Sequence, residues 1–309
     1  MAVLARSTPV LGQSAAAVNG ESGTSKVGSH AGAETFATAD EAANALVAAA
    51  RNYDVAKLLD IFGQGARDLV QTGEPPLDRQ RAADFAAQAS DRQRLVLDPS
   101  TRTRATLIVG KMDWPFPVPI RKRGSVWSFD TAAGREEILR RRIGSNELDA
   151  IEICHNYVDA QDEYAFRKRG GYDVNQYAQR IISSPGTQDG LAWRNSDGTW
   201  DGPIGEDVAE AIERGYRQGD PFHGYFFKVL KGQGPAAPLG ALSYVIDGVM
   251  IGGFALAAAP AHYGQTGVMT FIVSNKGVVY QKDLGPNTLS AFRSMTTYNP
   301  DKSWKPVPP

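Results

Sequence analysis

The histidines are the first candidates for chemistry, because an imidazole exchanges a proton near neutral pH. The sequence has four of them: His30, His155, His223 and His262. None stands in an H-x-H, H-x-x-x-H or H-E-x-x-H spacing, so the sequence predicts no metal site. His223 enters a predicted strand after a turn, whereas His262 lies in a predicted loop. The two are candidate catalytic residues if the fold brings them together as an acid/base pair; the alternative is hydrogen bonding within each loop.

Three carboxylates form a second candidate for catalysis: Asp159, Asp162 and Glu163. They cluster on a predicted long helix, and Arg167 follows Glu163 by four residues. A carboxylate pair at this spacing could serve acid/base chemistry or bind a cation. The alternative is a solvated helix face that carries an ion pair between residues four apart.

Aromatic residues near a run of prolines suggest binding rather than catalysis. The candidate binding residues are Trp114, Phe116 and Trp127, with Phe129 close by. Pro115, Pro117 and Pro119 alternate, so their missing N–H groups would all lie on one side, which permits an edge strand and argues against a central one. An edge strand beside exposed aromatic rings suits a peptide that adds as a further strand. The alternative is that these rings pack in the core.

Other familiar kinds of site are absent from the sequence. No G-x-S-x-G, phosphate-binding loop or strand–GxGxxG–helix pattern occurs, and no cofactor is predicted. The single cysteine, Cys154, excludes an intrachain disulfide and cysteine-rich zinc sites, and we interpret it as a small buried hydrophobic residue. The basic run 121–123 lies at a predicted hairpin tip without interleaved aromatic residues, so no nucleic-acid partner is predicted.

Composition places the chain among soluble globular proteins. Its 309 residues are 42% apolar and 22% charged, and its net charge is −1. This length is sufficient for two domains. The near-neutral charge predicts no strong field toward nucleic acid or an anionic membrane. No run of about 18 apolar residues occurs, so no transmembrane segment is predicted.

The first half of the chain predicts a tail followed by an α+β domain. Residues 1–35 are interpreted as a disordered tail or the remnant of a signal peptide, since Arg6 and Pro9 interrupt the apolar stretch that a signal needs. Residues 36–144 form the predicted N-terminal domain. It begins with a capping box at Thr38–Glu41 and continues with helices. The strands expected after the helices are Arg94–Leu97, Thr103–Val109, Pro117–Ile120 and Val126–Phe129.

Residues 145–309 predict a second α+β domain. Gly144 is expected to break the chain's helical pattern, and a long spine helix then runs to about Arg169, where Gly170-Gly171 ends it. Residues 185–205 are expected to be irregular, and 206–217 to be helical. An antiparallel sheet follows Pro221. Asp247-Gly248 predicts one hairpin and Asn275-Lys276-Gly277 another.

Several motifs, in order along the chain, resemble a bacterial family called domain of unknown function 2950. They occupy residues 36–42, 113–117, 127–134, 144–148, 157–161, 221–225, 250–255 and 267–273. The resemblance covers essentially residues 36 to 304. It implies an exported protein of Gram-negative bacteria, periplasmic or secreted, and it implies no established activity.

Two weaker resemblances concern shape. The order of helix, Gly-Gly-Tyr, loop and antiparallel sheet in the C-terminal half is similar to the globular heads of type IV pilin-like proteins. The long apolar N-terminal helix that drives pilin assembly is missing, so filament formation is not implied. The helices followed by a sheet in the N-terminal half are similar to nuclear-transport-factor-like and cystatin-like folds.

These observations favour a non-catalytic binding or interaction protein of the bacterial cell envelope. Its predicted partner is a protein, a peptide or a cell-wall component. One alternative is a hydrolase or small-molecule enzyme that uses the Asp/Glu cluster or the histidine pair. Another is a pilus-associated structural subunit.

Overall fold

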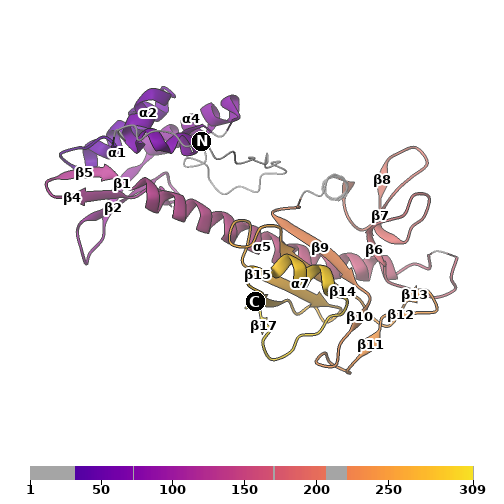
Figure 1. Cartoon of the computed structure of the whole chain (residues 1–309). Helices are drawn as coiled ribbons and strands as arrows, with labels where there is room; N and C mark the ends of the chain where they lie inside the picture. The colour runs from indigo at the N-terminus through magenta and orange to yellow at the C-terminus, as the bar shows by residue number, and fades with distance from the viewer. Residues whose placement is uncertain (1–31, 72, 170, 207–220, 309) are drawn as a thin grey trace, which may run out of the picture. The chain divides into compact units, whose positions relative to one another are not determined.

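The computed structural model describes residues 32–71, 73–169, 171–206 and 221–308 (Figure 1). The expected tail at 1–35 therefore falls mostly outside the described residues, and the expected helix at 206–217 almost wholly so. The chain is α+β, as predicted, and it forms two compact units that divide between Arg141 and Arg142. We call the described residues up to Arg141 unit 1 and those from Arg142 unit 2. The sequence predicted two domains, at residues 36–144 and 145–309. That each of these folds independently stays a prediction.

Unit 1 begins with a layer of helices. Its helices are α1 (Ala39–Arg51), α2 (Val55–Phe62), α3 (Arg67–Val70) and α4 (Pro75–Asp91), with the 3-10 turn Gln64–Ala66 before α3. The capping box that starts α1 is confirmed, since Thr38 Oγ1 accepts from Glu41 N at 3.1 Å. Glu41 Oε2 in turn accepts from Ala37 N at 3.0 Å. These bonds satisfy N–H groups that lack partners at the first turn of a helix.

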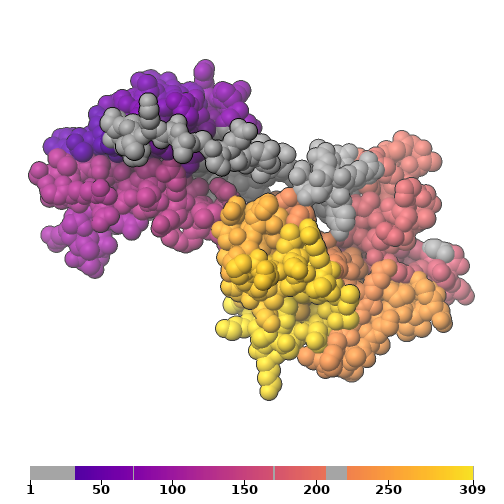
Figure 2. Space-filling view, in the orientation of Figure 1, coloured from indigo at the N-terminus to yellow at the C-terminus, as the bar shows by residue number. Residues whose placement is uncertain are grey.

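The helices cover one face of an antiparallel sheet, and Figure 2 shows the indigo and purple helices over the magenta strands. The strands are β1 (Gln93–Leu97), β2 (Arg104–Val109), β3 (Trp114–Pro115), β4 (Ile120–Arg123) and β5 (Val126–Phe129). Their order is β1-β2-β4-β5, and β3 also pairs with β2. Ala105, Leu107 and Ile120 on the covered face are at most 1% exposed and pack with the helices.

The proline run forms an edge strand only at its start, where Pro115 ends β3, a strand that pairs with β2 alone. Of the expected strand Pro117–Ile120, Ile120 alone belongs to a strand, and this strand, β4, lies between β2 and β5. Pro117 and Pro119 come before Ile120, the first residue of β4, so their missing N–H groups do not disturb the pairing of this strand. Val118, between two of them, is fully buried and lies against Gly134 of the next helix.

Helix α5 (Thr131–Ala165) crosses the division between the units without a break. The predicted break at Gly144 is wrong. A glycine inside a helix costs about 0.5–1 kcal/mol relative to alanine, and a helix of 35 residues tolerates this cost. No helix in the described part of the chain is both long and apolar enough to cross a membrane.

Unit 2 is built on a second antiparallel sheet. Its strands are β9 (Tyr225–Leu230), β14 (Ala255–Pro260), β15 (Met269–Ser274), β16 (Tyr280–Asp283) and β17 (Lys305–Pro306). The order is β17-β16-β15-β14-β9. Cys154 and Tyr157 of α5 pack into the core of this unit, and α7 (Thr288–Ser294) packs against β14. Burial raises the pKa of the Cys154 thiol to about 12, in accord with its predicted role as a buried hydrophobic residue.

Smaller ladders surround this sheet. They are β10 (Gly232–Gln233) with β11 (Leu242–Ser243), β12 (Val245–Ile246) with β13 (Val249–Met250), and β6 (Arg180–Ile182) with β7 (Gly190–Arg194) and β8 (Trp200–Asp201). The hairpin at Asp247-Gly248 is confirmed, and both residues have positive φ, 50° and 83°. The expectation of an irregular segment at 185–205 is wrong, because β7 and β8 lie there.

The two glycines inside α5 provide a matched test of the continuous helix. A Cβ added at Gly144 meets nothing within 4 Å, whereas one added at Gly134 would lie 2.6 Å from Val118 Cγ2. We expect Gly144→Ala to raise the free energy of unfolding by about 0.5–1 kcal/mol, since alanine is the better helix former. Gly134→Ala should lower it by about 1–3 kcal/mol through overpacking. Urea denaturation followed by circular dichroism measures both, and a destabilising Gly144→Ala would contradict an unbroken helix.

Candidate functional site

The two histidines singled out from the sequence have different partners. His223 and Gly224 form a two-residue turn with φ of 48° and 75°, which is the pattern of a type I′ turn. Phe222 and Tyr225 close it, their N–H groups each donating to the other's carbonyl. His223 Nδ1 lies 2.7 Å from Asp149 Oδ2 on α5. His262 is exposed, and its backbone N–H donates to Thr266 Oγ1 at 3.0 Å.

The His223–Asp149 pair has the geometry of an oriented imidazole. A carboxylate at Nδ1 favours the tautomer in which Nε2 accepts a proton, which is the arrangement of a general base. The pair sits among other anchors between α5 and loops of unit 2. Asn146 Nδ2 donates to Thr266 O at 2.8 Å, and Glu147 Oε1 accepts from the N–H groups of Val268 and Met269 at 2.9 and 3.0 Å. The same contacts therefore fasten the turn and the loop to the helix.

The carboxylate cluster lies on the exposed surface of α5. Asp159, Asp162 and Glu163 are all exposed, and the described residues contain no group of His, Cys, Asp and Glu side chains that could hold a metal ion. Burial, and after it the charge of Asp162, raise the pKa of Tyr177. Two cavities in unit 1, one beside α1 and α4 and one beside Lys57 and Asp60, are lined by none of these carboxylates and by no histidine.

The aromatic candidates lie mostly inside unit 1. Phe116 is 1% exposed and Trp127 is 9% exposed, and both belong to the core. Phe116 packs edge-on against Phe129, with ring centroids 6.2 Å apart. Trp114 is half-buried, and the Arg141 guanidinium lies 5.6 Å from its ring centroid. The burial of Phe116 and Trp127 agrees with the alternative of core packing, and a binding role for the three aromatic residues stays a prediction.

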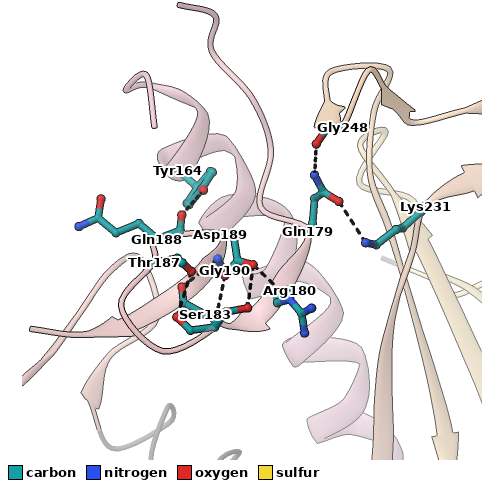
Figure 3. A network of polar contacts seen from close by, with 11 residues as sticks. Tyr164, Gln179, Arg180, Ser183, Thr187, Gln188, Asp189, Gly190, Lys231 and Gly248 are labelled. Carbon is teal, nitrogen blue, oxygen red and sulfur yellow. Dashed lines mark hydrogen bonds and ion pairs between the residues drawn. The ribbon is translucent and has the colours of Figure 1, made fainter. Parts of the chain in front are cut away.

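A polar network in unit 2 was missed by the sequence analysis (Figure 3). Asp189 closes the connection between β6 and β7. Its Oδ1 accepts from Ser184 N at 2.7 Å and from Thr187 Oγ1 at 2.8 Å, and its Oδ2 lies 3.2 Å from Arg180 Nε. Burial raises the pKa of this carboxyl, but the hydrogen bonds from Ser184 and Thr187 outweigh burial and lower it. Because its oxygens are engaged in closing a loop, Asp189 is a structural residue.

Strand β1 presents an open edge of the sheet of unit 1. Asp98 N donates to Arg104 O and Gly110 N donates to Arg92 O, both at 2.8 Å. In an antiparallel ladder alternate residues bond to the partner strand, so the even-numbered residues of β1 bond to β2. The backbone N–H and C=O groups of Gln93, Leu95 and Leu97 therefore point away from β2. Among the described strands, none pairs with that side of β1.

Two of the five side chains of β1 are both apolar and exposed. Val96 is 41% exposed and Leu97 is 48% exposed, whereas Leu95 is half-buried against the core. The loop after the strand is held by Asp98, whose Oδ1 accepts from Ser100 N at 2.8 Å and Thr101 N at 3.0 Å. Hydrogen bonds from Thr101 and Ser100 lower the pKa of this carboxyl. The edge thus ends in a turn that is closed by hydrogen bonds to Asp98.

A groove of about 540 Å³ opens beside the start of β1, between α1 and α4. Its floor includes Val47 and Ala48. Two hydrogen bonds between its lining side chains, both 2.9 Å long, hold it together: Arg51 Nη2 donates to Ser90 Oγ, and Gln93 Nε2 donates to Asn44 Oδ1. Since Gln93 is also the first residue of β1, the groove and the open edge are continuous. We call them together the β1 site.

Comparison with known proteins gives a family and no activity. The family model described as "Protein of unknown function (DUF2950)" matches residues 33–307. No curated protein and no solved structure matches the chain.

The orientation of the β1 backbone predicts an alternating pattern of hydrogen exchange. The N–H groups of Arg94 and Val96 bond to β2, whereas those of Leu95 and Leu97 face the open edge. We expect the amides of Leu95 and Leu97 to exchange at least about tenfold faster than those of Arg94 and Val96, because an unpaired amide needs no opening of the sheet. NMR-detected exchange measures all four. Uniform protection along β1 would contradict an open edge.

Proposed function

The chain belongs to the family described as "Protein of unknown function (DUF2950)", which names no activity, and we propose that it is a non-catalytic binding protein of the bacterial cell envelope. In this proposal the β1 site takes up an extended peptide segment, which adds to the sheet of unit 1 as a further strand. The envelope location is part of the proposal, and it is supported by the resemblance of the motifs to an exported family.

One observation carries the proposal: the outward-facing backbone groups of Gln93, Leu95 and Leu97 on a terminal strand. An added peptide would pair with one N–H and one C=O on each of these residues. Each hydrogen bond contributes about 0.5–1.5 kcal/mol net of its exchange with water. Main-chain pairing of this kind gives affinity, and the side-chain pockets beside it give specificity.

The surroundings of the edge supply such pockets. The exposed Val96 and Leu97 side chains stand on opposite faces of β1, because side chains alternate along a strand. Each would cover apolar surface of the added strand. The groove beside Gln93 has room for one side chain of the peptide, with Val47 as an apolar wall and Arg51 and Asn44 as polar ones.

A second candidate function is an enzymatic one, and the His223–Asp149 contact of 2.7 Å supports it. It would use His223 Nε2 as a proton acceptor. The two candidate sites lie in different units, so one substitution distinguishes the two functions. Replacing His223 by alanine removes the base and leaves the β1 site in unit 1 unchanged. The proposal of strand addition predicts that His223→Ala binds peptide as the unchanged chain does.

Proline at an outward-facing position tests strand addition directly. Leu97→Pro removes an N–H that faces the open edge, a place where sheets tolerate proline. Leu97→Ala shortens the same side chain and keeps the N–H. With peptides selected on the full chain from a random displayed library, we expect Leu97→Pro to weaken binding at least about tenfold, or 1.4 kcal/mol. Leu97→Ala should weaken it less.

Isothermal titration calorimetry measures both affinities, and circular dichroism checks that Leu97→Pro stays folded. If Leu97→Pro and Leu97→Ala bind the selected peptides equally well, the peptide does not pair with the backbone of β1. If the library yields no binder that depends on this edge, the proposed function loses its basis.

A further inference from the structure

The sheet of unit 1 has one face turned away from its helices, and this face is lined with arginines. Ala105 and Leu107 of β2 pack under the helices. Because side chains alternate along a strand, the neighbouring Arg104 points to the other face. By the register of the strands, the same face carries Arg94, which stands opposite Ile108, and Arg121 and Arg123 of β4. Arg92, just before β1, has extended backbone geometry and belongs to the same face. All five side chains are exposed.

The chain's own carboxylates neutralise the positive charge of this face only in part, since Asp113, Asp130 and Asp98, whose pKa the charge of Arg104 helps to lower, face five arginines. Asp113 lies 3.6 Å from Arg92 and 3.5 Å from Arg94, so one carboxylate is shared by two guanidinium groups. Asp130 lies 3.4 Å from Arg121, and its other oxygen accepts from Ala133 N at the start of α5. Among the described residues, no ion pair joins Arg104 or Arg123 to a carboxylate.

Two of these arginines stand directly opposite each other. Arg104 of β2 is the register partner of Arg121 of β4. Like charges directly opposite each other on one face of a sheet repel and destabilise it. The repulsion falls when an anion lies between or beside the two groups. The sheet therefore presents a surface whose charge is complementary to an acidic ligand.

We propose that the segment taken up at β1 is acidic, with carboxylates at alternate positions. This inference rests on the proposed function. In an added strand every second side chain lies on the arginine-bearing face, beside Arg92 and Arg94. The intervening side chains lie on the helix side, beside Leu95 and Leu97, where an apolar residue is favoured. The ligand is thus an extended peptide with one acidic and one apolar face.

The same charges exclude the most obvious competitor, a second copy of this chain. Two β1 edges paired with each other would place the arginines of both copies on one sheet, where they repel. Charged residues on an edge strand are a common means of preventing such self-association. An acidic peptide reverses the sign of this interaction, so the edge that rejects a second copy attracts the ligand.

Three synthetic peptides test the inference on the full chain. They alternate valine with glutamate, glutamine or lysine; the first two have nearly the same shape and differ in charge, and the third reverses the sign of the charge. We expect the glutamate peptide to bind at least about tenfold more tightly than the glutamine peptide, and the lysine peptide to bind most weakly. The double variant Arg92→Glu/Arg94→Glu should invert this order. Arg167→Glu, the same exchange at an exposed position of unit 2, should leave the order unchanged.

The outcomes separate the inference from the proposed function. Equal binding of the three peptides overturns the acidic preference and leaves strand addition standing. Failure of all three to bind overturns both. If the glutamate peptide binds Leu97→Pro as tightly as the unchanged chain, or if inorganic polyphosphate displaces it at equal charge concentration, the arginine face binds anions without strand addition and the inference is wrong.

Discussion

The backbone hydrogen-bonding capacity of strands is the constraint on which this structure depends, because every open sheet has two edges that something must satisfy. In unit 1 the two terminal strands, β1 and β5, differ in how their outer backbone groups are satisfied. At β5, Phe36 and Trp127 exchange both backbone bonds at 2.8 Å, which covers part of that edge. In unit 2, the terminal strand β17 ends at Pro306, which has no N–H to offer. At β1, by contrast, three residues direct their N–H and C=O groups outward.

Sequence patterns predicted local features and failed where long-range pairing decides. The capping box at Thr38–Glu41 and the hairpin at Asp247-Gly248 depend on residues close in the chain, and both were predicted. The proline run suggested an edge because prolines cannot donate. This holds for Pro115 in β3, which pairs with β2 alone, and fails for β4, which its pairing with both β2 and β5 places inside the sheet. Similarly, Gly144 looked like a helix end, since its local cost is visible and the packing of the remainder of α5 is not.

The same distinction explains the candidate sites. Spacing along a helix showed that Asp159, Asp162 and Glu163 share a face, but a shared face carries no information about burial, and this one is exposed. His223 was noticed as a residue type, while its partner Asp149 was not, because 74 positions separate them. A positive φ at a histidine marks its turn as special, and that signal appears only in the structure. No sequence pattern could have shown that Leu97 faces an open edge.

An exposed edge strand can bind a ligand, but it can also pair with other chains and aggregate. The short length of β1 and the charges beside it limit such unwanted pairing. A long, flat, apolar edge invites aggregation. β1 is five residues long and is followed by the turn held by Asp98, which limits how much of another strand can pair with it. Arg92 and Arg94 add a repulsive term against any like-charged edge, including its own. If β1 binds the acidic segment proposed above, one pair of arginines both suppresses unwanted pairing and sets specificity.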